Sequence, residues 1–106
     1  MYRQLSHEEA EQLMAEREII IADVRDYDSF AENHIAGAIH LSMPAMQEFC
    51  ETANKEQPIL VYCYHGISSQ SVAQHLVEQG FAEIYSLQGG FEAWKEHHQT
   101  SSESDN

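Results

Sequence analysis

The stretch of sequence that decides the fold is Ile59-Leu60-Val61-Tyr62-Cys63-Tyr64-His65-Gly66-Ile67-Ser68-Ser69. Its four leading apolar residues predict a buried strand that ends at Cys63, and a helical pattern begins near Ser69 after a short loop. This order places a thiol at the carboxyl end of a strand, the edge of an open α/β sheet where ligands bind. Unpaired backbone N–H groups and the dipole of the following helix attract anions there. We therefore expect Cys63 to ionise more readily than a free cysteine and to act as a nucleophile.

The loop after Cys63 supplies groups that can stabilise a negatively charged sulfur. Its backbone N–H groups can point inward, and Gly66 permits a conformation that a side chain would resist. The hydroxyls of Ser68 and Ser69 can donate further hydrogen bonds or cap the helix. His65 either raises the local positive potential when protonated or faces solvent, and the sequence leaves both open. With Cys63 as the catalytic residue, the candidate substrate-binding loop comprises Tyr64, His65, Gly66, Ile67, Ser68 and Ser69.

Strand and helix patterns alternate along the chain. Short apolar runs predict strands over residues 19–22, 39–41, 59–62 and 82–86. Helices are predicted to open at a capping box of Ser6 and Glu9, and to cover residues 27–32, 44–52, 69–79 and 91–97. The alternation predicts a single α/β domain, with a parallel central sheet and helices on both faces. We assign this domain to residues 1–98 and a polar C-terminal tail to residues 99–106.

The composition limits the classes of partner and compartment. A chain of 106 residues is long enough for one domain with its own core. The net charge of −13 argues against nucleic acid and anionic membranes, because both require basic patches. No apolar run approaches the roughly 20 residues that cross a bilayer, and residues 1–5 lack the features of a signal peptide. Two cysteines, Cys50 and Cys63, do not make a disulfide framework, so we expect free thiols in a cytoplasmic protein.

Several other residues are better explained by structural roles. Asp23 and Arg25 follow a predicted strand, where they can pair and fix neighbouring loops, so we expect them to support the site rather than react. Cys50 lies within a predicted helix, and no anion-binding loop follows it. His97-His98 has no further clustered ligands, so we expect no metal site. Gly89-Gly90 is expected to form a tight turn that serves packing.

Four segments, in this order and at these spacings, together resemble the rhodanese (thiosulfate sulfurtransferase) family. They are Asp23-Val24-Arg25, residues 30–38, the loop that opens at Cys63, and Leu87-Gln88-Gly89-Gly90-Phe91-Glu92-Ala93-Trp94. The resemblance covers nearly the whole chain, and the short length is similar to that of the single-domain members of the family.

The resemblance implies a two-step transfer of sulfur. A rhodanese-like cysteine thiolate attacks the outer sulfur of thiosulfate, sulfite departs, and the cysteine is left as a persulfide. The persulfide then passes its outer sulfur to a nucleophilic acceptor, such as cyanide, a dithiol or a thioredoxin-like protein. This is covalent catalysis by displacement and requires no cofactor. On this basis Cys63 would carry the sulfur, and the loop residues would bind the anion.

Two alternative classes of protein share parts of this pattern. A Cys-x5-Arg loop binds phosphate in tyrosine phosphatases and arsenate reductases, where the arginine fork binds the oxyanion. Here Ser69 occupies the arginine position, so phosphoryl transfer lacks its main charge stabiliser. Some rhodaneses also carry cationic loop residues, and this chain has none there. The second alternative, a persulfide carrier in a protein-to-protein sulfur relay, stays open because the same loop would serve a carrier.

Overall fold

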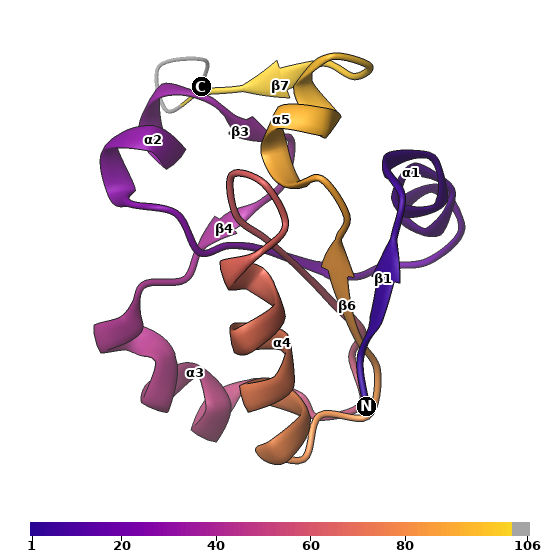
Figure 1. The fold of residues 1–106 in the computed structure, drawn as a ribbon. Coiled ribbons are helices and arrows are strands. Elements are labelled where there is room, and N and C mark those ends of the chain that lie inside the picture. The colour runs from indigo at the N-terminus through magenta and orange to yellow at the C-terminus, as the bar shows by residue number, and fades with distance from the viewer. Residues whose placement is uncertain (103–106) are drawn as a thin grey trace.

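The chain folds around a five-stranded sheet in which every pairing is parallel. The computed structural model describes residues 1–102 and gives the strand order β1-β6-β5-β2-β4 (Figure 1). These strands are β1 (Arg3–Leu5), β2 (Ile20–Asp23), β4 (Ile39–His40), β5 (Ile59–Tyr62) and β6 (Ile84–Leu87). Two shorter strands, β3 (His34–Ile35) and β7 (Thr100–Ser101), form a separate antiparallel pair. The parallel sheet predicted from the alternating pattern is confirmed.

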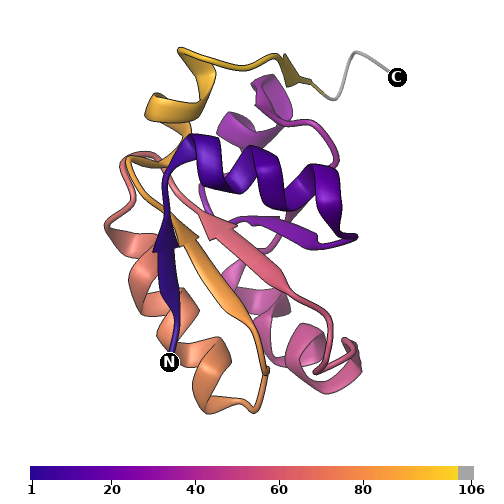
Figure 2. The same ribbon diagram turned by 90° about the vertical axis from the view of Figure 1, so that its right-hand side faces the viewer.

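Helices cover both faces of this sheet. They are α1 (His7–Glu16), α2 (Tyr27–Glu32), the 3-10 helix η1 (Met43–Ala45), α3 (Met46–Thr52), α4 (Ser68–Glu78) and α5 (Gly90–Lys95). Figure 1 shows α3 and α4 on one side of the sheet, and Figure 2 shows α1 crossing the opposite face. No helix among residues 1–102 combines the length and the apolar content needed to cross a bilayer.

The central strand β5 divides the hydrophobic core in two. Ile59 and Val61 pack with residues of α3 and α4, whereas Leu60 and Tyr62 pack with residues of α1 and α5. All four side chains are fully buried. Because successive strand side chains point to opposite faces, a continuous apolar run is what a strand covered on both sides requires. Rigid burial on both faces fixes where β5 ends, and therefore where Cys63 emerges.

The start of α1 follows the predicted capping box. The Ser6 hydroxyl accepts a hydrogen bond from the Glu9 N–H, and the Glu9 carboxylate accepts one from the Ser6 N–H. The other predicted helices are present with ends shifted by a residue or two, and the helix predicted over residues 44–52 begins as η1 and continues as α3. Pro44 lies in η1, where its missing N–H costs no helical hydrogen bond.

Two features differ from the sequence prediction. The pattern does not predict β1, which is only three residues long and pairs with β6 from the far end of the chain. The sequence predicts a polar tail from residue 99, yet Thr100 and Ser101 form β7 and pair with Ile35 and His34. Strands this short are too brief to show an alternation of apolar and polar residues. They form because a partner strand pairs with them, not because of a local sequence pattern. The remainder of the predicted tail, residues 103–106, lies outside the described residues.

Candidate active site

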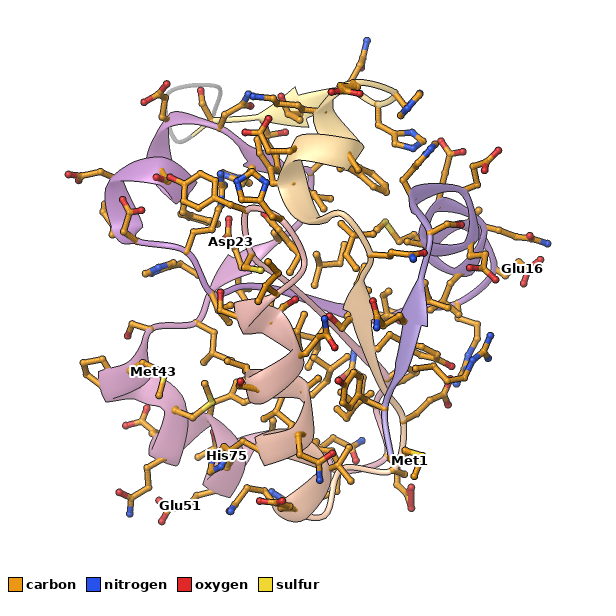
Figure 3. All side chains as sticks on the ribbon, viewed as in Figure 1. Met1, Glu16, Asp23, Met43, Glu51 and His75 are labelled. Carbon is orange, nitrogen blue, oxygen red and sulfur yellow. The ribbon has the colours of Figure 1, made fainter. Side chains whose placement is uncertain are left out.

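The carboxyl ends of three neighbouring strands meet at one edge of the sheet. Asp23 ends β2, Cys63 directly follows β5, and Gly89 follows β6. Figure 1 shows the loop between β5 and α4 at this edge, close to the start of α5. In Figure 3 Asp23 lies at the same edge, whereas Glu51 and His75 lie toward the opposite end of the molecule. The predicted site residues are therefore brought together at one edge.

The sulfur of Cys63 accepts hydrogen bonds from the backbone of its own loop. The Gly66 N–H lies 3.2 Å from Sγ, and the Ser69 N–H lies 3.3 Å from it. Cys63 itself is only 4% exposed. Ser69 lies in the first turn of α4, so its N–H is one of those that the helix leaves without an internal partner. The loop thus directs backbone dipoles at the position where negative charge develops.

These contacts change the acidity of the thiol. Burial acts to raise the pKa of Cys63, but hydrogen bonds from the hydroxyls of Ser69 and Ser68 and from the N–H groups of Ser69 and Gly66 outweigh it. The net effect lowers the pKa of Cys63 from 9.0 to about 7. These four donors are uncharged. Near neutral pH, a substantial share of Cys63 is therefore thiolate, the form that attacks sulfur.

The first turn of α5 fixes the base of the same loop. The Phe91 N–H donates to the Cys63 carbonyl at 2.8 Å, and the Glu92 N–H donates to the Tyr64 carbonyl at 3.0 Å. Within the loop, the Gln70 amide donates to the Gly66 carbonyl at 2.8 Å. All three hydrogen bonds are accepted by carbonyl groups of the loop, so they leave the N–H groups of the loop free to donate to the sulfur.

Glycine is required where α5 meets the loop. At Gly90 (φ +61°), a Cβ atom would lie 2.5 Å from the Tyr64 carbonyl and 2.6 Å from the Cys63 oxygen. At Gly66 (φ +84°), a Cβ atom would lie 2.8 Å from the Gly89 nitrogen. The tight turn expected at Gly89-Gly90 therefore does more than serve packing, because it lets two backbones approach closely enough to hydrogen-bond.

Asp23 and Arg25 form a buried ion pair beneath the loop. The Arg25 Nη2 lies 2.8 Å from Asp23 Oδ2, the Arg25 Nε lies 3.1 Å from both carboxylate oxygens, and the Arg25 N–H donates to Oδ1 at 2.8 Å. Nη2 also donates to the Asn33 carbonyl at 2.6 Å. The guanidinium carbon lies 4.2 Å from the ring centroid of Phe91 and 5.2 Å from that of Tyr64. The pair connects the end of β2 to the loop and to α5.

Replacing Arg25 with alanine should therefore lower stability and turnover together. It leaves the Asp23 carboxylate buried without its partner, which costs about 3 kcal/mol. The matched control is Arg17→Ala, which removes a solvent-screened ion pair with Glu83 and should leave stability nearly unchanged. Thermal unfolding and turnover would be measured on both variants. An Arg25→Ala protein of unchanged stability and no activity would instead indicate that Arg25 contacts the substrate.

Four loop side chains are exposed. Ile67 is 76% exposed, Tyr64 is 40% exposed, and His65 and Ser68 are also exposed. The Tyr64 hydroxyl contacts the Ser29 hydroxyl and donates to Asp26 Oδ1 at 3.4 Å, which connects the loop to α2. Of the two possibilities left open for His65, its exposure favours the solvent-facing one.

In the part of the chain that the structure describes, Cys50 and the His97-His98 pair make no hydrogen bond with the Cys63 loop. Cys50 is buried in α3, where desolvation raises the pKa of its thiol. His98 accepts or donates a hydrogen bond with His7, Nε2 to Nδ1, at 3.0 Å. Within residues 1–102, no cluster of three or more histidine, cysteine or acidic side chains could hold a metal ion.

Three residues at the site were missed by sequence reasoning. Gln70 binds the Gly66 carbonyl, the Phe91 N–H binds the Cys63 carbonyl, and the Ser86 hydroxyl lies 2.8 Å from that of Ser69. Phe91 lies in one of the segments that carry the family resemblance, which is a signal for its importance. Gln70 and Ser86 carry no such signal, because their contacts depend on how the elements pack.

The fold and the site together define a class of protein: an α/β domain with an activated cysteine at the carboxyl edge of its sheet, held in a loop whose N–H groups donate to the sulfur. A family model described as a rhodanese-like domain matches residues 6–97. The protein named thiosulfate sulfurtransferase GlpE in Coxiella burnetii is 69% identical over 101 residues, covering 95% of this chain and 94% of that protein. The protein of the same name in Vibrio cholerae is 51% identical over 85 residues, 80% of each chain.

A solved structure has the same fold. A solution NMR structure of a rhodanese-like domain from an Anabaena protein superimposes with a TM-score of 0.85 at 23% identity, covering 97% of this chain and 82% of that one. The chain belongs to the rhodanese family.

Proposed function

We propose that this protein is a thiosulfate sulfurtransferase in which Cys63 carries the transferred sulfur as a persulfide. The activity is supported by two relatives of that name, one 69% identical over 95% of this chain and one 51% identical over 80% of it. The assignment of Cys63 rests on the environment of its sulfur. The sulfur accepts hydrogen bonds from the N–H groups of Gly66 and Ser69, and the pKa of the thiol is lowered to about 7.

In the first step the Cys63 thiolate attacks the outer sulfur of thiosulfate. A new bond forms between Sγ and that sulfur, the bond between the two thiosulfate sulfurs breaks, and sulfite leaves with the electron pair. The negative charge moves from Sγ to the outer sulfur of the persulfide. Gly66, Ser68 and Ser69 supply the donors that stabilise this charge, acting as preorganised dipoles.

In the second step a nucleophile attacks the outer sulfur and regenerates the thiolate. With cyanide, a carbon–sulfur bond forms, the persulfide S–S bond breaks, and thiocyanate leaves. We propose a thiol-bearing protein as the acceptor in the cell, because the exposed apolar side chains of Ile67 and Tyr64 border the loop. Such a surface suits contact with a protein more than with a small anion. Free Cys63 and Cys50 thiols fit a reducing cytoplasm, the compartment we propose.

Incubation with thiosulfate followed by intact mass measurement tests the assignment directly. We expect the mass of one sulfur atom to be added, and to be lost again when cyanide is supplied. An aryl phosphate assayed on the same preparation should be hydrolysed negligibly, because Ser69 cannot replace the guanidinium fork of a phosphatase. Loading without turnover to cyanide, but with transfer to a protein dithiol, would favour the persulfide carrier.

The rate of sulfur loading should depend on pH through the Cys63 thiol. Because its pKa is lowered to about 7, the thiolate fraction is depleted below that pH and nearly complete above pH 8. The second-order loading rate should fall about tenfold per unit below the pKa and reach a plateau above it. Single-turnover loading is the appropriate measurement, because cyanide itself titrates. A midpoint near 9 would show that the loop does not activate the thiol.

A further inference from the structure

Two buried serine hydroxyls face each other behind the Cys63 loop. Ser69 lies in the first turn of α4 and Ser86 lies in β6, and both residues are fully buried. Their Oγ atoms are 2.8 Å apart. In the register of β5 and β6, Ser86 pairs with Val61. Val61 lies two residues before the reactive Cys63. The pair therefore lies at the junction between the sheet and the base of the loop.

One proton lies between these two oxygens, so only one of them can donate to the other. Among the hydrogen bonds of residues 1–102, the Ser86 hydroxyl has a single partner, the Ser69 hydroxyl. If Ser69 donated to Ser86, the Ser86 proton would be buried without an acceptor, which is unfavourable. If Ser86 donates to Ser69, every proton is used, provided that the Ser69 proton finds an acceptor of its own.

The Cys63 sulfur is the candidate acceptor. The Ser69 N–H already lies 3.3 Å from Sγ, so the residue is held against the sulfur by its backbone. Its hydroxyl is also first among the donors that lower the pKa of Cys63. A hydroxyl that accepts one hydrogen bond becomes a stronger donor in the next, so donation from Ser86 strengthens the bond from Ser69 to the thiolate.

We propose that Ser86 is a positioning residue for Cys63: its hydroxyl donates to Ser69 and thereby directs the Ser69 proton to the sulfur. Ser86 does not touch the substrate and acts only through Ser69. The inference rests on the proposed role of Cys63, although it concerns the ionisation of the thiol and not the identity of the sulfur donor.

The test is the pH dependence of Cys63 alkylation by iodoacetamide, followed peptide by peptide so that Cys50 is counted separately. Ser86→Ala should raise the pKa of Cys63 by about half a unit, which lowers its thiolate fraction at pH 6 about threefold. Ser71→Ala, the same change at an exposed position of α4, should leave the pKa unaltered. The neighbouring titratable side chains are the same in every variant: Asp23, Arg25, Tyr64, His65 and Glu92.

A double-mutant cycle separates positioning from a general structural effect. Ser69→Ala should raise the pKa by more than Ser86→Ala does, and adding Ser86→Ala to it should have no further effect. Ser86→Thr keeps the hydroxyl and should keep the wild-type pKa, with folding checked by thermal unfolding. The proposal would be overturned if folded Ser86→Ala kept the wild-type pKa of Cys63. It would also be overturned if Ser86→Ala shifted that pKa equally in the wild-type protein and in Ser69→Ala. Because alkylation needs no thiosulfate, such a failure would leave the sulfurtransferase assignment intact.

Discussion

Replacing Cys63 with alanine should reduce thiosulfate-dependent turnover by a factor of about 1,000 or more and abolish sulfur loading. The reason is chemical rather than structural. The donors from Gly66 and Ser69 converge on Sγ, and without that atom no bond to the transferred sulfur can form. Turnover with thiosulfate and cyanide gives the first quantity, and intact mass after thiosulfate alone gives the second.

Cys50→Ala is the matched control for the thiol. Cys50 is also buried and free, but it lies in α3 and its pKa is raised rather than lowered. This variant should load sulfur and turn over at close to the wild-type rate, with a modest loss of stability from the cavity. Loading that survives in Cys63→Ala would contradict the assignment of Cys63 as the sulfur carrier.

Replacing Gly90 with alanine should disrupt the site through its backbone. A Cβ atom there would lie 2.5 Å from the Tyr64 carbonyl, so the start of α5 must move away from the loop. The hydrogen bonds from Phe91 and Glu92 to the loop carbonyls would be lost with it. We expect about 3 kcal/mol of destabilisation and a fall in Tm of roughly 10–20 °C. Turnover should fall even at temperatures where the variant remains folded.

Gly80→Ala isolates the cost of the backbone conformation alone. Gly80 also has a positive φ, +98°, but a Cβ atom there would meet nothing within 4 Å. Alanine in this conformation should cost about 1 kcal/mol and leave turnover unchanged. Similar losses of Tm in the two variants would mean that the close approach of α5 to the loop is not important for stability.

The parts of the fold that could be predicted are those whose signal is local. The apolar run of β5 and the capping box of α1 each lie within a few consecutive residues, and both are confirmed. By contrast, β1 exists because Arg3–Leu5 pairs with β6, about eighty positions later in the sequence. β7 likewise depends on pairing with β3. No local pattern encodes such pairings, because the partner strand supplies the hydrogen bonds.

The same division applies to the candidate site. Cys63 and its loop were predicted from a strand, a glycine and a helix start that are adjacent in sequence, and the structure places the loop N–H groups at the sulfur. The proximity of Asp23 and Arg25 was predicted as well, and the ion pair is present. The family resemblance indicates Phe91 without giving its contact, and Ser86 has no sequence signal, because each contacts the loop from an element distant in the sequence.

The contact between α5 and the Cys63 loop also bears on how the protein matures during synthesis. The ribosome makes the cysteine loop first, and the backbone that fixes its carbonyls emerges only after Gly90 has been added. At the usual pace of translation, the nascent chain therefore spends a few seconds with Cys63 as an ordinary thiol. We expect the loop to hold its donors at the sulfur only once α5 has docked, so an incomplete chain released before that point should carry a less activated thiol.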